Sequence, residues 1–293
     1  MISTRLRPAL FAAASLLLAA GAFAQAPAAP KVDFPAPSPA ATVKQRVGLT
    51  DIEIAYSRPG VKGRQIFGGT EAYGRVWRTG ANNATRLTFS TPVKFHGAQL
   101  DAGTYELFTI PNKTEWTVIV QKAAKQWGAY KYEEKNDAAR VTVKPIALAD
   151  SVETFAIELN DITDDSATLN LSWEKTRVPV KLEFDVAGTL VPQIEAAVAA
   201  EGKRPAQFYY SAAAFYLGHG LDLQKALAWA NESVALNPKA PYMMLVKARI
   251  HAKLGEKEAA LAAAKSAQTL GIAVEGPQSP FIKMGDDLIA SLR

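Results

Sequence analysis

Between Tyr56 and Arg86 the chain gathers six basic side chains against a single acidic one, Glu71. Guanidinium groups bind carboxylates and phosphates through paired hydrogen bonds, and aromatic rings offer flat faces to a sugar ring. Glycines in the same stretch let backbone amides approach an anion closely. Together with two aromatic residues farther along, this composition predicts a site for an anionic or carbohydrate ligand. The candidate binding residues are Arg58, Lys62, Arg64, Tyr73, Trp77, Arg78, Asn82, Trp127 and Tyr130.

A structural interpretation of the same residues stays open. Each guanidinium group would then pair with a carboxylate elsewhere or donate to loop carbonyl oxygens, and charge clusters also arise in ordinary solvated loops. Trp127 and Tyr130 have a similar alternative, because aromatic side chains more often belong to the core or its rim than to a ligand platform.

Catalytic chemistry has fewer candidates. The chain contains no cysteine, which excludes disulfides, zinc–cysteine sites, iron–sulfur clusters and cysteine nucleophiles. A pair of carboxylates could hydrolyse a glycosidic bond if two of them converged, although spacing alone does not show that they do. The candidate carboxylates on predicted strands are Glu106, Glu115, Glu153 and Glu174.

Metal chemistry is weakly indicated. The chain has three histidines, His96, His219 and His251, and turn polarity or the helix dipole explains these better than catalysis. The aspartates between 161 and 165 depart from the spacing of a calcium loop and lack its closing glutamate, which favours a hairpin turn. We therefore expect no metal site and no cofactor.

The elements that position these residues are strands over the first part of the chain. Apolar and polar residues alternate with period two in about nine segments between residues 52 and 186, and turn-forming residues separate the segments. Short, evenly spaced strands without intervening helices indicate an antiparallel β sandwich or barrel-like domain.

Farther along, alanine becomes abundant and the apolar period changes. The sequence predicts helices near 192–201, 206–218, 222–236, 241–254, 257–270 and 281–292. When the sequence of this region is compared with itself at an offset of 34 residues, similar residues align, and 34 is the length of a tetratricopeptide repeat. We expect an all-α, tetratricopeptide-like helical domain that depends on the β domain for stability, because two repeats bury little apolar surface alone.

The amino-terminal segment is typical of an exported protein. Arg5 and Arg7 precede an apolar run, and Ala22-Phe23-Ala24 has the form of a cleavage site, which predicts a signal peptide. The expected organisation is a signal peptide at 1–24, a Pro/Ala-rich linker at 25–46, the β-rich domain at 47–187 and the helical domain at 188–293. The apolar run is too short for a membrane span and no second candidate follows, so we expect a periplasmic or secreted protein without a transmembrane segment after cleavage.

Four motifs carry a resemblance to a known family. They are Ser57–Arg64, Tyr73–Asn82, Ala102–Pro111 and Gln126–Tyr130, followed by Leu171-Ser172-Trp173-Glu174-Lys175. In this order they resemble the bacterial exported family catalogued as domain of unknown function 2911, over roughly residues 45 to 186. The resemblance implies a β-rich exported domain and assigns no activity.

Two functions from different classes remain. The first is a non-catalytic envelope protein whose β domain binds an anionic or carbohydrate ligand and whose helical repeats bind a protein partner. The second is a hydrolase of an envelope polymer, in which arginines hold an anionic group and an acidic residue acts as base. The first is favoured because it requires recognition alone. Neither involves nucleic acid.

Overall fold

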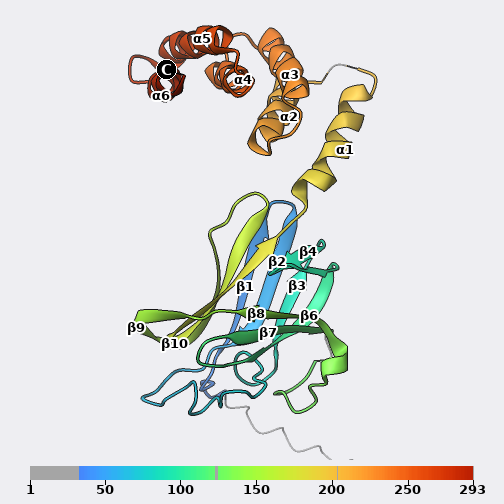
Figure 1. Cartoon of the computed structure of the whole chain (residues 1–293), viewed down its shortest axis with the longest axis vertical. Helices are drawn as coiled ribbons and strands as arrows, with labels where there is room; N and C mark the ends of the chain where they lie inside the picture. Colours follow the sequence, from blue (N-terminus) through green and yellow to red (C-terminus); the bar gives the residue numbers. More distant parts are fainter. Residues whose placement is uncertain (1–32, 123–124, 203, 293) are drawn as a thin grey trace, which may run out of the picture. The chain divides into compact units, whose positions relative to one another are not determined.

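The computed structural model describes residues 33–122, 125–202 and 204–292. The predicted signal peptide and residues 25–32 of the predicted linker lie outside the described residues. In the part that is described, ten strands precede six α-helices, and a short 3-10 helix (Glu134–Asn136) lies between the seventh and eighth strands (Figure 1).

The strands form two antiparallel sheets. The larger sheet has six strands, in the order β1 (Ala40–Val47), β2 (Thr50–Ser57), β3 (Thr85–Phe89), β6 (Gly103–Ile110), β7 (Trp116–Lys122) and β8 (Asp137–Val143). The smaller sheet has four, in the order β5 (Ala98–Leu100), β4 (Val93–Phe95), β10 (Ser166–Glu183) and β9 (Ile146–Asn160).

One apolar core joins the two sheets. It includes the inward side chains Leu87 and Leu107 of the larger sheet and Leu171 and Val180 of the smaller one, all at most 2% exposed. Alternation places these side chains on one face of each strand, since successive residues point to opposite faces. The prediction of an antiparallel β sandwich or barrel-like domain followed by helices is thus confirmed, and the two sheets form a sandwich.

Two strand boundaries differ from the prediction. β1 begins at Ala40, inside the segment interpreted as a linker, because residues 40–47 pair along their whole length with β2. β10 runs from Ser166 to Glu183 without interruption, whereas the alternation predicts one strand at 169–173 and another at 178–186. Register shifts flank Glu174, whose backbone is left-handed at φ 52°. This bulge changes which residues face the core, so the alternation appears broken in the sequence.

The turns follow their predicted chemistry. His96 and Gly97, with φ of 47° and 91°, form the two-residue loop between β4 and β5, as expected of a hairpin. Gly48 begins the equivalent loop between β1 and β2 at φ 54°. A Cβ atom at Gly48 would lie 2.0 Å from the carbonyl oxygen of Asp164, so glycine is required there also by space.

The helices match the predicted segments closely. They are α1 (Val186–Ala199), α2 (Ala206–Gly218), α3 (Leu223–Leu236), α4 (Pro241–Lys253), α5 (Lys257–Glu275) and α6 (Pro280–Ser291). α1 begins earlier than predicted because the Asp185 side chain accepts a hydrogen bond from the amide of Gly188 at 2.7 Å and caps the helix.

The helical region has its own apolar cluster, which includes Tyr216 and Trp229. Leu190 of α1 and Phe215 of α2 also pack against the sandwich core. Among the described residues, no helix combines the length and apolar character needed to cross a membrane.

Candidate ligand-binding site

Two of the five arginines of the basic segment, Arg58 and Arg64, bind backbone carbonyls. The segment forms the long connection between β2 and β3. Arg58 donates from Nε to the carbonyl oxygen of Phe155 at 2.9 Å. Arg64 donates to the carbonyl oxygens of Val61 and Gly60 at 3.0 and 2.6 Å. These are the contacts expected when guanidinium groups order a loop.

Lys62 and Asn82 are exposed and occupy left-handed turns, with φ of 50° and 60°. The amide of Lys62 donates to the carboxylate of Glu153 at 2.9 Å. Asn82 donates from Nδ2 to the Ser57 hydroxyl at 3.2 Å. Both residues therefore help to shape the loop, and the side chain of Lys62 faces solvent.

Trp77 belongs to the interior. Its side chain is 3% exposed, and its ring stacks on Trp173 at 5.7 Å with an interplanar angle of 18°. Phe67, Trp116 and Phe155 pack around it, and its Nε1 donates to a backbone carbonyl at 3.1 Å. A ring enclosed in this way offers no surface to a ligand, so Trp77 contributes to stability rather than to recognition.

Glu71 is a half-buried carboxylate on which the charges of Arg78 and Arg64 act. Burial raises the pKa of Glu71 to about 7, while the charges of Arg78 and Arg64 oppose this shift. The Nε atom of Arg78 is buried and has no hydrogen-bond partner. Glu71 is not one of the candidates from the sequence. Its burial depends on the path of the loop, which no sequence pattern reveals.

Tyr73 lies at a different place in the β region. Its ring packs against Gly68, where a Cβ atom would come within 2.5 Å of Tyr73 Cε2. Tyr73 lines a small cavity of about 150 Å³ together with Phe67 and Trp116. No other candidate binding residue lines this cavity.

Trp127 and Tyr130 form an exposed aromatic pair. Their side chains are 63% and 79% exposed, and the rings stack at 5.7 Å with an interplanar angle of 16°. We refer to these two rings as the aromatic platform. Two stacked rings that both face water form a contiguous aromatic surface available to a ligand, which distinguishes the platform from the enclosed Trp77.

The backbone beneath the platform is tied to a buried carboxylate. Glu106 of β6 is 1% exposed and accepts hydrogen bonds from the amide and the Nε2 atom of Gln126, at 2.7 and 3.0 Å. Gln126 Nε2 also donates to Gln121 of β7 at 3.0 Å. Charge-assisted bonds of this kind are short and strong. They fix the residue that immediately precedes Trp127.

Backbone hydrogen bonds from the basic segment also hold the platform loop. The amide of Gly128 donates to the carbonyl oxygen of Asn82, and the amide of Ala84 donates to that of Gln126, both at 3.0 Å. Gly128 has φ 71°, and a Cβ atom there would lie 2.7 Å from Tyr130 Cε2. Glycine is thus needed for the two rings to stack.

A small second core anchors the rest of this loop. Ala129 and Tyr132 pack on Phe108 and Ile119, on the face of the larger sheet that points away from the main core. The Tyr132 hydroxyl donates to Asp137 at 2.9 Å, and burial together with this carboxylate raises the pKa of Tyr132 to about 12. The loop is held underneath while its two outer rings remain in solvent.

The candidate carboxylates have structural contacts. Glu106 holds the platform loop, Glu153 holds the amide of Lys62, and Glu174 accepts the amide of Phe67 at 3.4 Å. Glu115 is exposed and precedes β7, outside the strand on which it was expected. These contacts account for three of the four carboxylates without assigning them to a reaction.

Residues 38–182 match a family described as a protein of unknown function, DUF2911. This match agrees with the resemblance carried by the sequence motifs and extends from the start of the larger sheet into β10. No curated protein and no solved structure matches the chain.

Proposed function

We propose that this protein, whose β region belongs to the DUF2911 family, is an exported, non-catalytic binding protein that recognises an envelope carbohydrate through the aromatic platform. The observation that supports this most directly is the stacked, exposed pair Trp127 and Tyr130 on a firmly anchored loop. Because the platform is ordered before binding, little conformational entropy is lost when a sugar ring stacks on it.

The charges around the platform favour an anionic sugar. Lys125 and Lys131 are exposed and flank the two rings in the sequence. Exposed lysines attract anions through water, and this attraction weakens as salt screens it. The proposal therefore includes a measurable ionic-strength dependence for acidic oligosaccharides and a smaller one for neutral ones.

Titration of the protein with neutral and uronic-acid oligosaccharides, followed by tryptophan fluorescence and calorimetry, tests the proposal. Trp127→Ala is expected to weaken binding by roughly tenfold or more, since each 1.4 kcal/mol of lost stacking and burial is tenfold in affinity. Its melting temperature should stay close to that of the parent, because the ring is 63% exposed.

Phe34→Ala provides the matched control. Phe34 is an exposed aromatic side chain, 80% exposed, that lies outside the platform. Its removal should leave affinity unchanged. Equal losses in Phe34→Ala and Trp127→Ala would mean that binding is non-specific, and the absence of saturable binding to every oligosaccharide would contradict the proposal.

The helical region is the proposed site of a protein partner. The helices form a cavity of about 400 Å³. Its lining includes Leu217 of α2, Arg249 and Lys253 of α4, Leu288 of α6, and Leu292, which caps the carboxyl end of α6. Apolar side chains beside two cations are complementary to an apolar peptide segment that carries an acidic group. Arg249→Glu is the variant expected to abolish such binding.

The hydrolase alternative has one supporting observation, the raised pKa of Glu71 next to two arginines. A carboxyl group with a pKa near 7 suits general acid–base catalysis, and arginines suit an anionic substrate. Release of reducing ends from an acidic polysaccharide, abolished by Glu71→Gln, would favour this function over binding alone.

A further inference from the structure

His219, at the carboxyl end of α2, has a fixed orientation. Its Nδ1 lies 3.0 Å from the carbonyl oxygen of Phe215, and its ring lies against the Phe215 ring at 4.0 Å. Phe215 itself packs on the sandwich core. A carbonyl oxygen can only accept a hydrogen bond, so Nδ1 carries the hydrogen and, in the neutral ring, Nε2 carries the lone pair.

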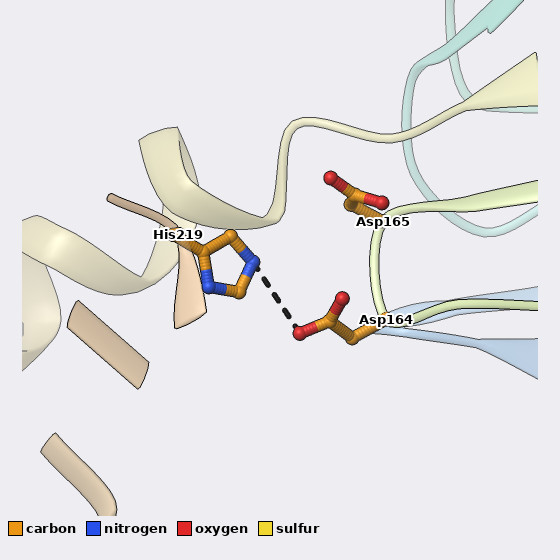
Figure 2. A group of neighbouring side chains, drawn as sticks. All are labelled: Asp164, Asp165 and His219. Carbon is orange, nitrogen blue, oxygen red and sulfur yellow. Dashed lines mark ion pairs between the residues drawn. The ribbon is translucent and has the colours of Figure 1, made fainter. Parts of the chain in front are cut away.

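That lone pair faces a carboxylate. His219 Nε2 is buried and has no hydrogen-bond partner, and it lies 3.4 Å from Asp164 Oδ2 (Figure 2). The side chain of His219 is 12% exposed. Two acceptors that face each other repel unless a positively charged species lies between them, and an unpartnered buried nitrogen is costly.

Asp165 completes the group. One ligand atom from each of Asp164, Asp165 and His219 lies within 4.8 Å of the other two. Asp165 Oδ1 accepts a hydrogen bond from the Thr163 hydroxyl at 2.7 Å. A polar partner behind the carboxylate and a carbonyl behind the imidazole are the outer contacts that orient metal ligands in proteins.

The tip of the β9–β10 hairpin is held in place by its neighbour. Gly48 in the β1–β2 turn comes so close to the carbonyl oxygen of Asp164 that only a glycine fits, and the carbonyl of Asp165 accepts the amide of Phe184 at 2.8 Å. The two carboxylates therefore project from a supported turn, toward a histidine that is itself fixed.

We infer that Asp164, Asp165 and His219 bind a divalent first-row transition cation, with zinc as the best-suited ion. One imidazole nitrogen and two carboxylate oxygens form a donor set that zinc and its neighbours accept, whereas calcium and magnesium prefer oxygen alone. Two negative charges and a lone pair are better balanced by a divalent cation than by one proton. The ion would link the β9–β10 hairpin to α2.

Chelator-treated full-length mature protein, titrated with Zn²⁺ by calorimetry, tests the inference. We expect one saturable site and a rise in melting temperature with added Zn²⁺, because a ligand that binds the folded state alone stabilises it. Co²⁺ should replace Zn²⁺ and give a visible absorption band from a nitrogen–oxygen ligand field. Asp165→Asn and His219→Gln should each weaken binding at least tenfold.

Two control variants separate this site from general surface attraction. Asp161→Asn removes the same charge from the same turn without touching the group, and His96→Gln removes an exposed imidazole elsewhere; both should bind Zn²⁺ like the parent. Loss of binding equal in Asp161→Asn and Asp165→Asn, or no saturable binding at one equivalent, would overturn the inference. A melting temperature that does not change with added Zn²⁺ would also overturn it.

Discussion

Replacing Glu106 with glutamine isolates the bond that holds the aromatic platform. Both oxygens of Glu106 accept hydrogen bonds from Gln126, and the side chain is 1% exposed. A glutamine keeps the shape but has one acceptor oxygen, so one buried donor of Gln126 must face an NH₂ group. Leaving a buried donor without its acceptor costs about 1–3 kcal/mol.

This cost can be measured as a shift in thermal unfolding. For a domain of about 150–250 residues, each kcal/mol lowers the melting temperature by about 2–4 °C. A loss of about 2 kcal/mol therefore predicts that Glu106→Gln melts about 4–8 °C below the parent. Affinity for the oligosaccharide should fall as well, although Trp127 and Tyr130 are untouched, because the residue before them loses its anchor.

Differential scanning calorimetry and sugar titration on the same preparation provide the assay. Glu115→Gln is the matched control, since Glu115 is exposed and the substitution is chemically identical. If Glu106→Gln melts within 1 °C of Glu115→Gln, the buried carboxylate does not support the loop and the reasoning is refuted. If stability falls but affinity per folded molecule stays the same, Glu106 stabilises the fold without contributing to ligand binding by the platform.

Two further predictions concern pH and domain dependence. Because burial raises the pKa of Glu71 from 4.5 to about 7, the folded protein retains a proton that the unfolded chain releases, so this residue's contribution to stability declines as pH rises from about 4.5 to 7. Glu71→Gln should remove this decline, and its melting temperature relative to the parent should be higher at pH 8 than at pH 5; a pH-independent difference would contradict the assignment. A fragment of residues 188–293 should unfold at a lower temperature than the full chain, because Leu190 and Phe215 pack against the sandwich core, and equal melting temperatures would count against this dependence.

The secondary structure could be predicted well where one physical rule acted alone. Alternation identified the inward residues of β2 and β6, and α2 was predicted at its observed limits of 206–218. The prediction of element boundaries failed where a second local effect altered the simple alternation or helical periodicity. Around Glu174 a bulge changes the side of the strand that faces the core, and at α1 a capping aspartate extends the helix beyond its periodic part.

The candidate site could be predicted in part, for a related reason. Composition identified Trp77 and Trp127 alike as aromatic residues in glycine-rich loops, yet one is 3% and the other 63% exposed. The difference arises from tertiary packing, since Trp173 comes from a distant strand to cover Trp77. Likewise, no spacing rule could bring Asp164 and His219 together, because their proximity depends on how a hairpin tip meets a helix end.

The bulge in β10 has a consequence for how this sequence can evolve. Before Glu174 the odd-numbered residues Leu169, Leu171 and Trp173 face the core. After Glu174 the even-numbered residues Val178, Val180 and Leu182 face it instead. Insertion or deletion of one residue beyond the bulge would turn every later side chain of the strand to the wrong face. Only insertions or deletions of two residues keep the later side chains on their correct faces. Alignments of related chains should therefore show either no gap or a two-residue gap at this point, while the adjoining loops vary in length.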